Sequence, residues 1–249
     1  LMTFDILAFI VKLAMLLIIR DRPKGMKRAK NKQGECIKVF DLLRGVGKII
    51  CNKQSWLIAL YGALMYAPTT ALNQWTASYL PLLKGYSEEK AAWLVSVMFI
   101  GWIFGSPTFG AISDYIGRRK FTLYISSLFT FCLAILILYI PQNSYLTYNL
   151  LYFAFGFFTC GFIPSFSIIR EQHEPEYSGS ALGFMNMINS LGPCISPLLV
   201  GILLDSLWTG AVMNHQKIYS INDYQIALSV TTLFLFLALL VLPFIKETF

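Results

Sequence analysis

Long apolar stretches alternate with short polar breaks along the whole chain. Seven stretches are about 20 residues long or longer and contain few charged residues, and a helix needs roughly that length to cross the ~30 Å hydrocarbon core of a bilayer. They are residues 1–19, 55–80, 91–113, 121–140, 147–169, 179–205 and 224–245. The pattern predicts an all-α integral membrane protein, a helical bundle with seven spans.

The first polar break, residues 20–54, is much longer than the others. Its second part, residues 37–50, has apolar residues at helical spacing, which predicts an amphipathic helix. These residues are Val39, Leu42, Leu43, Val46, Ile49 and Ile50. Two interpretations stay open: a helix that lies on the cytoplasmic membrane surface, and a plain connector whose charges only set the topology.

The composition excludes several other classes of protein. Hydrophobic residues make up 56% of the 249-residue chain and charged residues 13%, whereas soluble domains average about 25% charged residues. Intrinsic disorder requires low hydrophobicity. Residues 20–53 contain 11 of the 20 Lys and Arg residues and 3 acids. The positive charge is therefore confined to one loop, and no nucleic-acid-binding domain is expected.

The positions of the basic residues predict the orientation in the membrane. If the seven stretches cross it in turn, 16 of the 20 Lys and Arg residues face one side and 3 face the other. Basic loops stay in the cytoplasm. The C-terminus and the 20–54 loop are therefore predicted to be cytoplasmic, in a plasma membrane or bacterial inner membrane.

Few residues suit metal or acid–base chemistry. No two of the five cysteines have the spacing of a zinc or redox pair, and His173 and His215 have no carboxylate or cysteine at ligand spacing. We expect no disulfide, metal ion or cofactor. The spans from residue 55 onward contain no interior histidine or acid pair, so no enzyme is expected.

The break after the third stretch contains a compact motif. Gly110, Asp114 and Gly117 are followed by Arg118, Arg119 and Lys120. Gly110 allows another helix to approach closely, and Gly117 allows a tight turn. Asp114 can attract the positive N-terminus of a neighbouring helix. The basic residues can bind anionic lipid headgroups or a carboxylate on a partner.

This motif resembles the loop signature of the major facilitator superfamily, except that Tyr115 stands where the family usually has a basic residue. Its place two helices after a basic loop matches the second copy, between helices 8 and 9. The resemblance implies that residues 1–19 are helix 6, that 20–54 are the central cytoplasmic linker and that 55–249 are helices 7–12. The C-terminal six-helix half would thus follow one further transmembrane helix.

The resemblance implies transport of a small-molecule substrate by alternating access, as a secondary active transporter such as a symporter, or as a facilitator. The expected partners are membrane lipids and the missing N-terminal half. Because an alternating-access site is shared between two halves, we expect residues 1–249 alone to insert into a membrane without transporting. The alternative is a seven-helix receptor or another membrane protein that does not transport.

Polar side chains at membrane depth are candidates for the substrate cavity, because polar groups in lipid must be paired or face water. They are Tyr66, Asn73, Gln74, Trp75, Asn186 and Asn189. Asn186 and Asn189 are three residues apart and are predicted to share a helix face. Hydrogen bonding between helices is the alternative role for each residue. The gating candidates are Gly110, Asp114, Gly117, Arg118 and Arg119.

Overall fold

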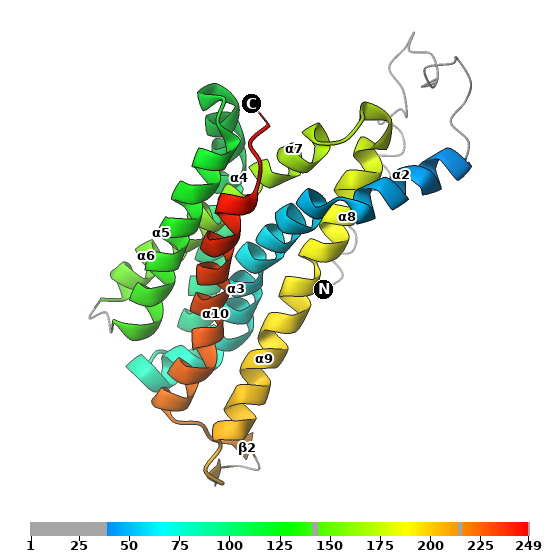
Figure 1. Cartoon of the computed structure of the whole chain (residues 1–249). Coiled ribbons are helices and arrows are strands. Elements are labelled where there is room, and N and C mark those ends of the chain that lie inside the picture. The colour runs from blue at the N-terminus through cyan, green and yellow to red at the C-terminus, as the bar shows by residue number, and fades with distance from the viewer. Residues whose placement is uncertain (1–38, 141–143, 214–215, 249) are drawn as a thin grey trace, which may run out of the picture. The chain divides into compact units, whose positions relative to one another are not determined.

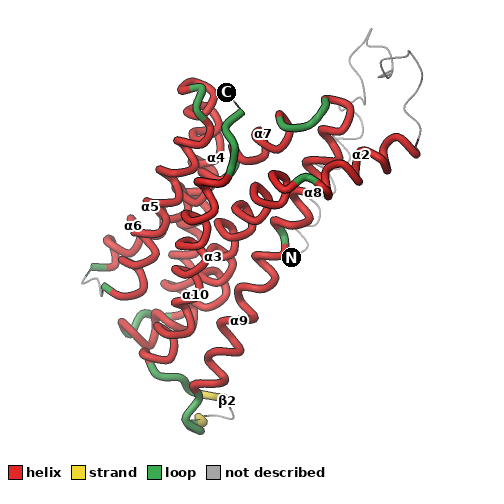
Figure 2. The backbone as a smooth tube through the Cα atoms, viewed as in Figure 1, coloured by secondary structure: helices red, strands yellow, loops and turns green. Residues whose placement is uncertain are grey.

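The computed structural model describes residues 39–140, 144–213 and 216–248 and is helical over most of them (Figures 1 and 2). The elements are α2 (Val39–Cys51), α3 (Lys53–Lys84), α4 (Glu88–Ile116), α5 (Arg119–Tyr139), α6 (Tyr145–Thr159), η1 (Cys160–Phe162), α7 (Pro164–Glu171), η2 (Pro175–Tyr177), α8 (Ser178–Asn189), α9 (Leu191–Leu207), β1 (Val212–Met213), β2 (Gln216–Lys217), α10 (Ile221–Val241) and η3 (Leu242–Phe244). The predicted first span, 1–19, and the basic segment 20–38 lie outside the described residues.

The predicted all-α membrane fold is confirmed. Among the described residues, five helical segments are long and apolar enough to cross a membrane. They are Glu88–Ile116, Arg119–Tyr139, Tyr145–Glu171, Pro175–Leu207 and Ile221–Phe244. The helix α3 is also long, at 32 residues, but polar side chains interrupt its apolar sequence. The sequence pattern did not indicate the short antiparallel hairpin of β1 and β2, in which Val212 pairs with Lys217.

Glycines allow α4 and α6 to pack backbone against backbone. A Cβ atom added to Gly156 would collide with the main chain of Met98, and one added to Gly101 would collide with that of Phe153. Small residues are common at helix contacts in membranes because they permit this approach. The contact fixes α6, and therefore the start of α7, against α4.

Two spans are interrupted near their middle. The segment Tyr145–Glu171 passes through the 3-10 turn η1 before Pro164 restarts it as α7. The segment Pro175–Leu207 changes from α8 to α9 at Ser190. Such breaks change the direction of a helix and the side chains that it presents at membrane depth.

The predicted amphipathic helix forms as α2, and it packs on other parts of the bundle. Ile49 is buried, and the ring of Tyr177 packs directly on Gly45. Lys48 lies 3.4 Å from Glu174 and 5.2 Å from the Tyr177 ring centroid. The linker helix therefore contacts the turn between α7 and α8. Its relation to a membrane surface stays a prediction.

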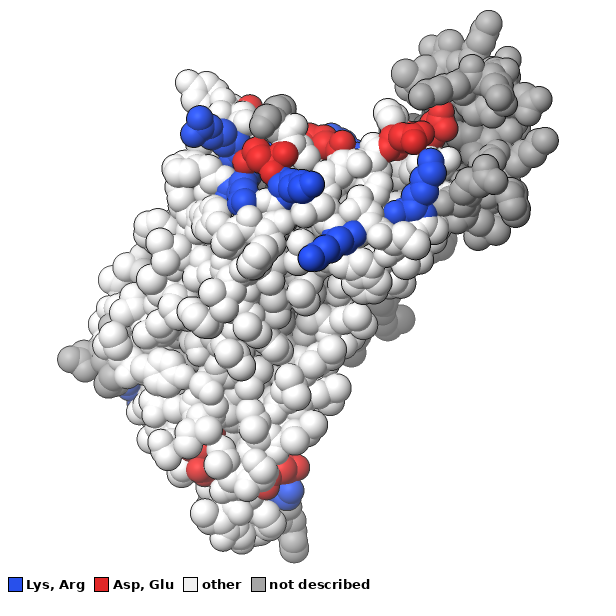
Figure 3. Space-filling view, in the orientation of Figure 1, with Lys and Arg blue, Asp and Glu red and all other residues white. Residues whose placement is uncertain are grey.

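Charged side chains gather at the two ends of the helices, and the face shown in Figure 3 is almost free of charge between them. One end contains the turn from α4 to α5 and the segment after α10, and we call it the Arg119 end. The other contains the β1–β2 hairpin, and we call it the hairpin end. This separation is what a bilayer requires of a protein that crosses it.

Candidate functional site

The candidate site begins with a row of polar side chains on α3. Asn73 and Gln74 are exposed at the surface of the bundle. The next residue, Trp75, is partly buried and donates its indole N–H to the carbonyl oxygen of Pro197 at 3.3 Å. One turn earlier, Thr70 donates to the carbonyl oxygen of Pro193 at 3.3 Å. Side chains of α3 therefore bond to the backbone of α9 near its prolines, where part of the helical hydrogen bonding is lost.

A pocket of about 410 Å³ lies between the second half of α3 and α9. Its lining residues are Gln74, Trp75, Pro197, Leu198, Gly201, Ile202 and Asp205. A Cβ atom added to Gly201 would lie 3.4 Å from the Trp75 ring, at van der Waals distance, so Gly201 and Trp75 are neighbours in this wall. The pocket contains two of the candidates predicted from the sequence, Gln74 and Trp75, and one further polar residue, the carboxylate of Asp205.

Asp205 is the charged group of this pocket, and the hairpin supplies its partners. Lys217 Nζ donates to Asp205 Oδ1 at 2.8 Å, and the Tyr219 hydroxyl donates to the same oxygen at 2.6 Å. Lys217 Nζ also lies 5.0 Å from the ring centroid of Trp208. These partners follow Asp205 by 12 and 14 residues, so helical periodicity gave no sign of them. The one available signal was an acid at the end of an apolar stretch.

The hydroxyl of Tyr219 stays protonated across the physiological pH range. Its hydrogen bond to the Asp205 carboxylate, followed by partial burial, raises the pKa of Tyr219 to about 12. A phenol that donates to a carboxylate loses a favourable interaction when it ionises. Tyr219 is therefore a permanent donor to Asp205 under ordinary conditions.

The two asparagines of α8, predicted to share a helix face, differ in their exposure. Asn186 is exposed, whereas Asn189 is 6% exposed. The Asn189 side chain lies where a Cβ atom on Gly62 would meet it, and its Oδ1 has no hydrogen-bond partner among the described residues. Residues three apart on a helix differ by about 60° in direction. This separation is enough for Asn189 to pack against α3 while Asn186 stays at the surface of the bundle.

Tyr66 belongs to an aromatic cluster at the middle of the bundle. Its ring centroid lies 5.3 Å from that of Trp102 on α4 and 6.0 Å from that of Phe162 in η1. These are ordinary separations for packed aromatic rings. The structure therefore places Tyr66 beside the break in the Tyr145–Glu171 segment, away from the pocket that contains Gln74 and Trp75.

At the Arg119 end, a buried arginine holds two carboxylates. Arg119 Nε donates to Glu171 Oε2 at 3.0 Å, and Nη2 donates to Glu171 Oε1 at 2.6 Å. Nη1 donates to Asp114 Oδ1 at 3.1 Å. The Arg119 side chain is 6% exposed, that of Glu171 28% and that of Asp114 71%. Glu171 is 52 residues away from Arg119 and was not among the residues predicted from the sequence.

This geometry revises the roles expected for the motif. Arg119 is buried against Glu171 and is not available to lipid headgroups, whereas Arg118 is exposed. Asp114 has a partner, Arg119, within its own bundle. Gly117 has φ +66°, the left-handed conformation that a tight turn needs. A Cβ atom at Gly110 would meet no described atom within 4 Å, so no helix of the described bundle makes the expected close approach there.

The segment after α10 is bonded to the same end. Thr248 donates its hydroxyl to Glu171 Oε2 at 2.6 Å, and the backbone N–H of Lys120 donates to Glu247 Oε2 at 3.0 Å. The side-chain amide of Gln54 donates to the carbonyl of Phe244 and accepts from the N–H of Lys246, each at 3.0 Å. The Arg119 end thus joins α3, α5, α7 and the end of the described chain.

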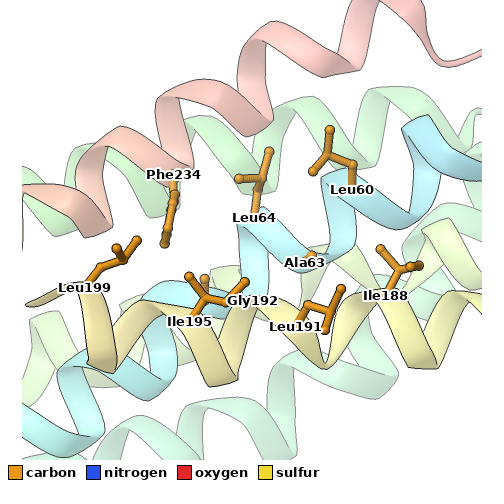
Figure 4. Close-up of a pocket in the computed structure, with 10 residues that line it drawn as sticks. Leu60, Ala63, Leu64, Ile188, Leu191, Gly192, Ile195, Leu199 and Phe234 are labelled. Carbon is orange, nitrogen blue, oxygen red and sulfur yellow. The ribbon is translucent and has the colours of Figure 1, made fainter.

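A second pocket, of about 260 Å³, has only apolar lining and lies beside α3, α8, α9 and α10 (Figure 4). Its residues are Leu60, Ala63, Leu64, Ala67, Ile188, Leu191, Gly192, Ile195, Leu199 and Phe234. It offers no hydrogen-bonding side chain to a polar solute. In the described part of the chain, no group of three His, Cys, Asp or Glu residues is placed to hold a metal ion.

The sequence profile described as the Major Facilitator Superfamily matches residues 2–197 and 69–248. The chain belongs to the major facilitator superfamily. Solved structures of this fold include a bacterial homologue of the human lysosomal transporter Spinster, with TM-score 0.64, 17% identity and coverage of 94% of this chain and 55% of that chain. The inward-open xylose transporter XylE from E. coli aligns with TM-score 0.58 and 19% identity, over 77% of this chain and 47% of that chain. Both alignments support a multi-pass membrane fold.

Curated relatives of this superfamily chain are solute transporters. The human lysosomal dipeptide transporter MFSD1 is 23% identical over 201 residues, which are 81% of this chain and 41% of that protein. A probable hexose phosphate transport protein of Chlamydia muridarum is 36% identical over 72 residues, 29% of this chain and 16% of that protein. The chain therefore spans less than half the length of these relatives.

Proposed function

We propose that this chain is the C-terminal part of a transporter that moves a small hydrophilic solute by alternating access. In this proposal residues 1–19 correspond to helix 6, residues 20–54 to the central linker and residues 55–249 to helices 7–12. The N-terminal half would cover the exposed polar side chains of α3 and α8. Family membership favours this function over the seven-helix receptor, because the curated relatives are transporters.

The exposed amides of α3 are the main support. At 1.5 Å per residue, Asn73 and Gln74 lie only about 7 and 8 Å from the midpoint of α3, well inside a ~30 Å hydrocarbon core. Both are exposed, and an amide in contact with lipid would lose its hydrogen bonds to water. These side chains therefore belong against water or another polar surface, which is the environment of a solute pathway.

Cysteine labelling tests this assignment. In the full-length protein without its native cysteines, Asn73→Cys and Gln74→Cys are each treated in membranes with a water-soluble maleimide. We expect labelling of at least one, since the pathway is filled with water in some states. Leu233→Cys is the matched control, because Leu233 is an exposed apolar residue in the middle of the membrane-length segment Ile221–Phe244 and should stay unlabelled. Inertness of both test positions would contradict the pathway.

Uptake defines the activity. The full-length protein in liposomes is offered radiolabelled alanyl-alanine, xylose and glucose 6-phosphate, with and without a proton or sodium gradient. Saturable uptake of at least one solute is expected, and its dependence on a gradient separates a symporter from a facilitator. Absence of uptake for a broader panel of solutes would contradict the proposed function.

We also propose that the Arg119 end is cytoplasmic and acts as a gate. Most basic residues face that side in the predicted topology, and Asp114 is 71% exposed while it pairs with Arg119. A carboxylate in this position can bind the positive N-terminus of a helix in the other half. Asp114→Asn should lower the uptake rate without changing the amount of protein in the membrane. Unchanged uptake would contradict the gate.

A further inference from the structure

The hairpin end holds an ammonium group in a site built by three side chains. The group is Lys217 Nζ, which lies 2.8 Å from the Asp205 carboxylate and 5.0 Å from the centroid of the Trp208 ring. The Tyr219 hydroxyl donates to the same carboxylate at 2.6 Å. A carboxylate and an aromatic ring that both lie near one ammonium group form an arrangement that attracts cations in general.

This arrangement adjoins the pocket between α3 and α9. Asp205 is the one charged residue in the described lining of that pocket, and Gln74 supplies an amide there. Both hydrogen bonds from Lys217 and Tyr219 go to Oδ1, so Oδ2 receives none from the described residues. The carboxylate thus retains acceptor capacity while it lines an open groove of about 410 Å³.

We propose that Asp205 recognises the primary ammonium group of a solute, and that Lys217 occupies this position when the solute is absent. The inference rests on the proposed transport function and adds a substrate class to it. An amino acid or short peptide would direct its ammonium group toward Asp205. Gln74 would bond to a neighbouring polar group, and Leu198 and Ile202 would contact the carbon chain.

Lys217 is suited to leave Asp205. The two side chains are 44% and 55% exposed, and an exposed ion pair is weak because water solvates and screens both charges. The strands that carry Lys217 are two residues long, and so short a hairpin has little stability of its own. If the ion pair between Lys217 and Asp205 only held the hairpin in place, Lys217 would not compete with a solute for Asp205.

The first test measures binding to purified full-length protein by calorimetry. The probes are alanyl-alanine, N-acetyl-alanyl-alanine, which lacks the ammonium group, and xylose. Lys217→Met should tighten the binding of alanyl-alanine about two- to fivefold, the strength of an exposed ion pair expressed as a ratio of dissociation constants. Binding of the acetylated peptide should not change. Lys90→Met is the matched control, because Lys90 is a lysine of the same end that also lies near an aromatic ring, Tyr145.

The second variant tests the carboxylate itself. Asp205→Asn should weaken alanyl-alanine binding by about tenfold or more, since a charge-assisted hydrogen bond is lost. Asp205→Glu should restore part of it, and thermal unfolding of each variant verifies its folding. The inference is overturned if Lys217→Met leaves alanyl-alanine binding unchanged, or if both peptides respond equally. Uptake of xylose without binding of any ammonium solute would overturn the inference and leave the proposed transport intact. Absence of all uptake would overturn the transport proposal itself.

Discussion

Each end of the bundle pairs a basic side chain with a carboxylate, but the two clusters differ in how far they are exposed to water. At the Arg119 end, one arginine that is 6% exposed holds Glu171 and Asp114. At the hairpin end, Lys217 and Asp205 are 44% and 55% exposed. The first cluster removes its cation from water and compensates it with three charge-assisted hydrogen bonds. The second leaves both charges partly hydrated.

The difference predicts which end can exchange partners. The planar guanidinium group of Arg119 binds both oxygens of Glu171, so its geometry is fixed, and separating the pair would leave a buried cation without compensation. The ammonium group of Lys217 is a point charge on a flexible stem, and water can replace Asp205 at little cost. We therefore expect the ion pairs of Arg119 to stay formed, and the ion pair between Lys217 and Asp205 to open readily.

The largest expected effect is that of removing the buried cation. Arg119→Met should lower the free energy of unfolding by about 2–4 kcal/mol, near the lower end of the range for breaking a buried ion pair because Asp114 is largely exposed. The counterpart at the other end, Lys217→Met, should change it by less than about 1 kcal/mol. Denaturation in detergent with a fluorescence readout measures both.

The control for this comparison is the neighbouring arginine. Arg118→Met removes the same charge from an exposed position and should behave like Lys217→Met. If Arg118→Met destabilised the protein as much as Arg119→Met, the effect would come from the net charge of that end. Burial of Arg119 would then not explain the difference in stability between the two ends.

A smaller effect is expected at the turn that positions Arg119. Gly117→Ala should destabilise the protein by about 1–2 kcal/mol, because a Cβ atom is strained in the left-handed conformation. Gly110→Ala has open space around the added atom and lies in a helical segment, so it should be neutral or stabilising. Thermal unfolding of the two variants measures the difference, and equal loss in both would show that the turn conformation does not matter.

The smallest expected effect is a response of the Arg119 end to acid. The His173 Nε2 lies 2.8 Å from the hydroxyl of the fully buried Ser55, and burial lowers the pKa of His173. The unfolded chain then binds a proton more readily than the folded one, so this contribution to stability is present above pH ~6.5 and declines as the pH falls below it. His173→Gln should reduce the difference in melting temperature between pH 7.5 and pH 5.5.

The hairpin end provides the contrast for this prediction. The pKa of Tyr219 is raised to about 12, so its hydroxyl keeps its proton over this whole pH range and continues to donate to Asp205. Tyr219→Phe should therefore leave the difference in melting temperature between the two pH values as it is in the unmodified protein. If Tyr219→Phe changed this difference more than His173→Gln did, each relative to the unmodified protein, the comparison would be reversed.

Local features of the structure follow from the sequence by itself. Apolar runs of membrane length specify helices, because a helix satisfies its own backbone hydrogen bonds in lipid. The turn signals at Gly85 and Gly117 mark the ends of α3 and α4, where both glycines have φ +66°. The amphipathic spacing of residues 37–50 predicts α2. Each of these depends on residues within a few positions of one another.

Only the tertiary structure decided which side chains meet. The sequence predicted that Gln74 and Trp75 matter, but it did not select Asp205 as their neighbour, because that pairing depends on how α9 packs beside α3. It identified Arg119 within its motif and missed Glu171, which is 52 residues away. Asn186 and Asn189 are close in sequence, yet one is exposed and the other is buried against α3. Periodicity describes a single helix, whereas burial and pairing depend on the helices beside it, and these contacts are set by the packing of the whole bundle.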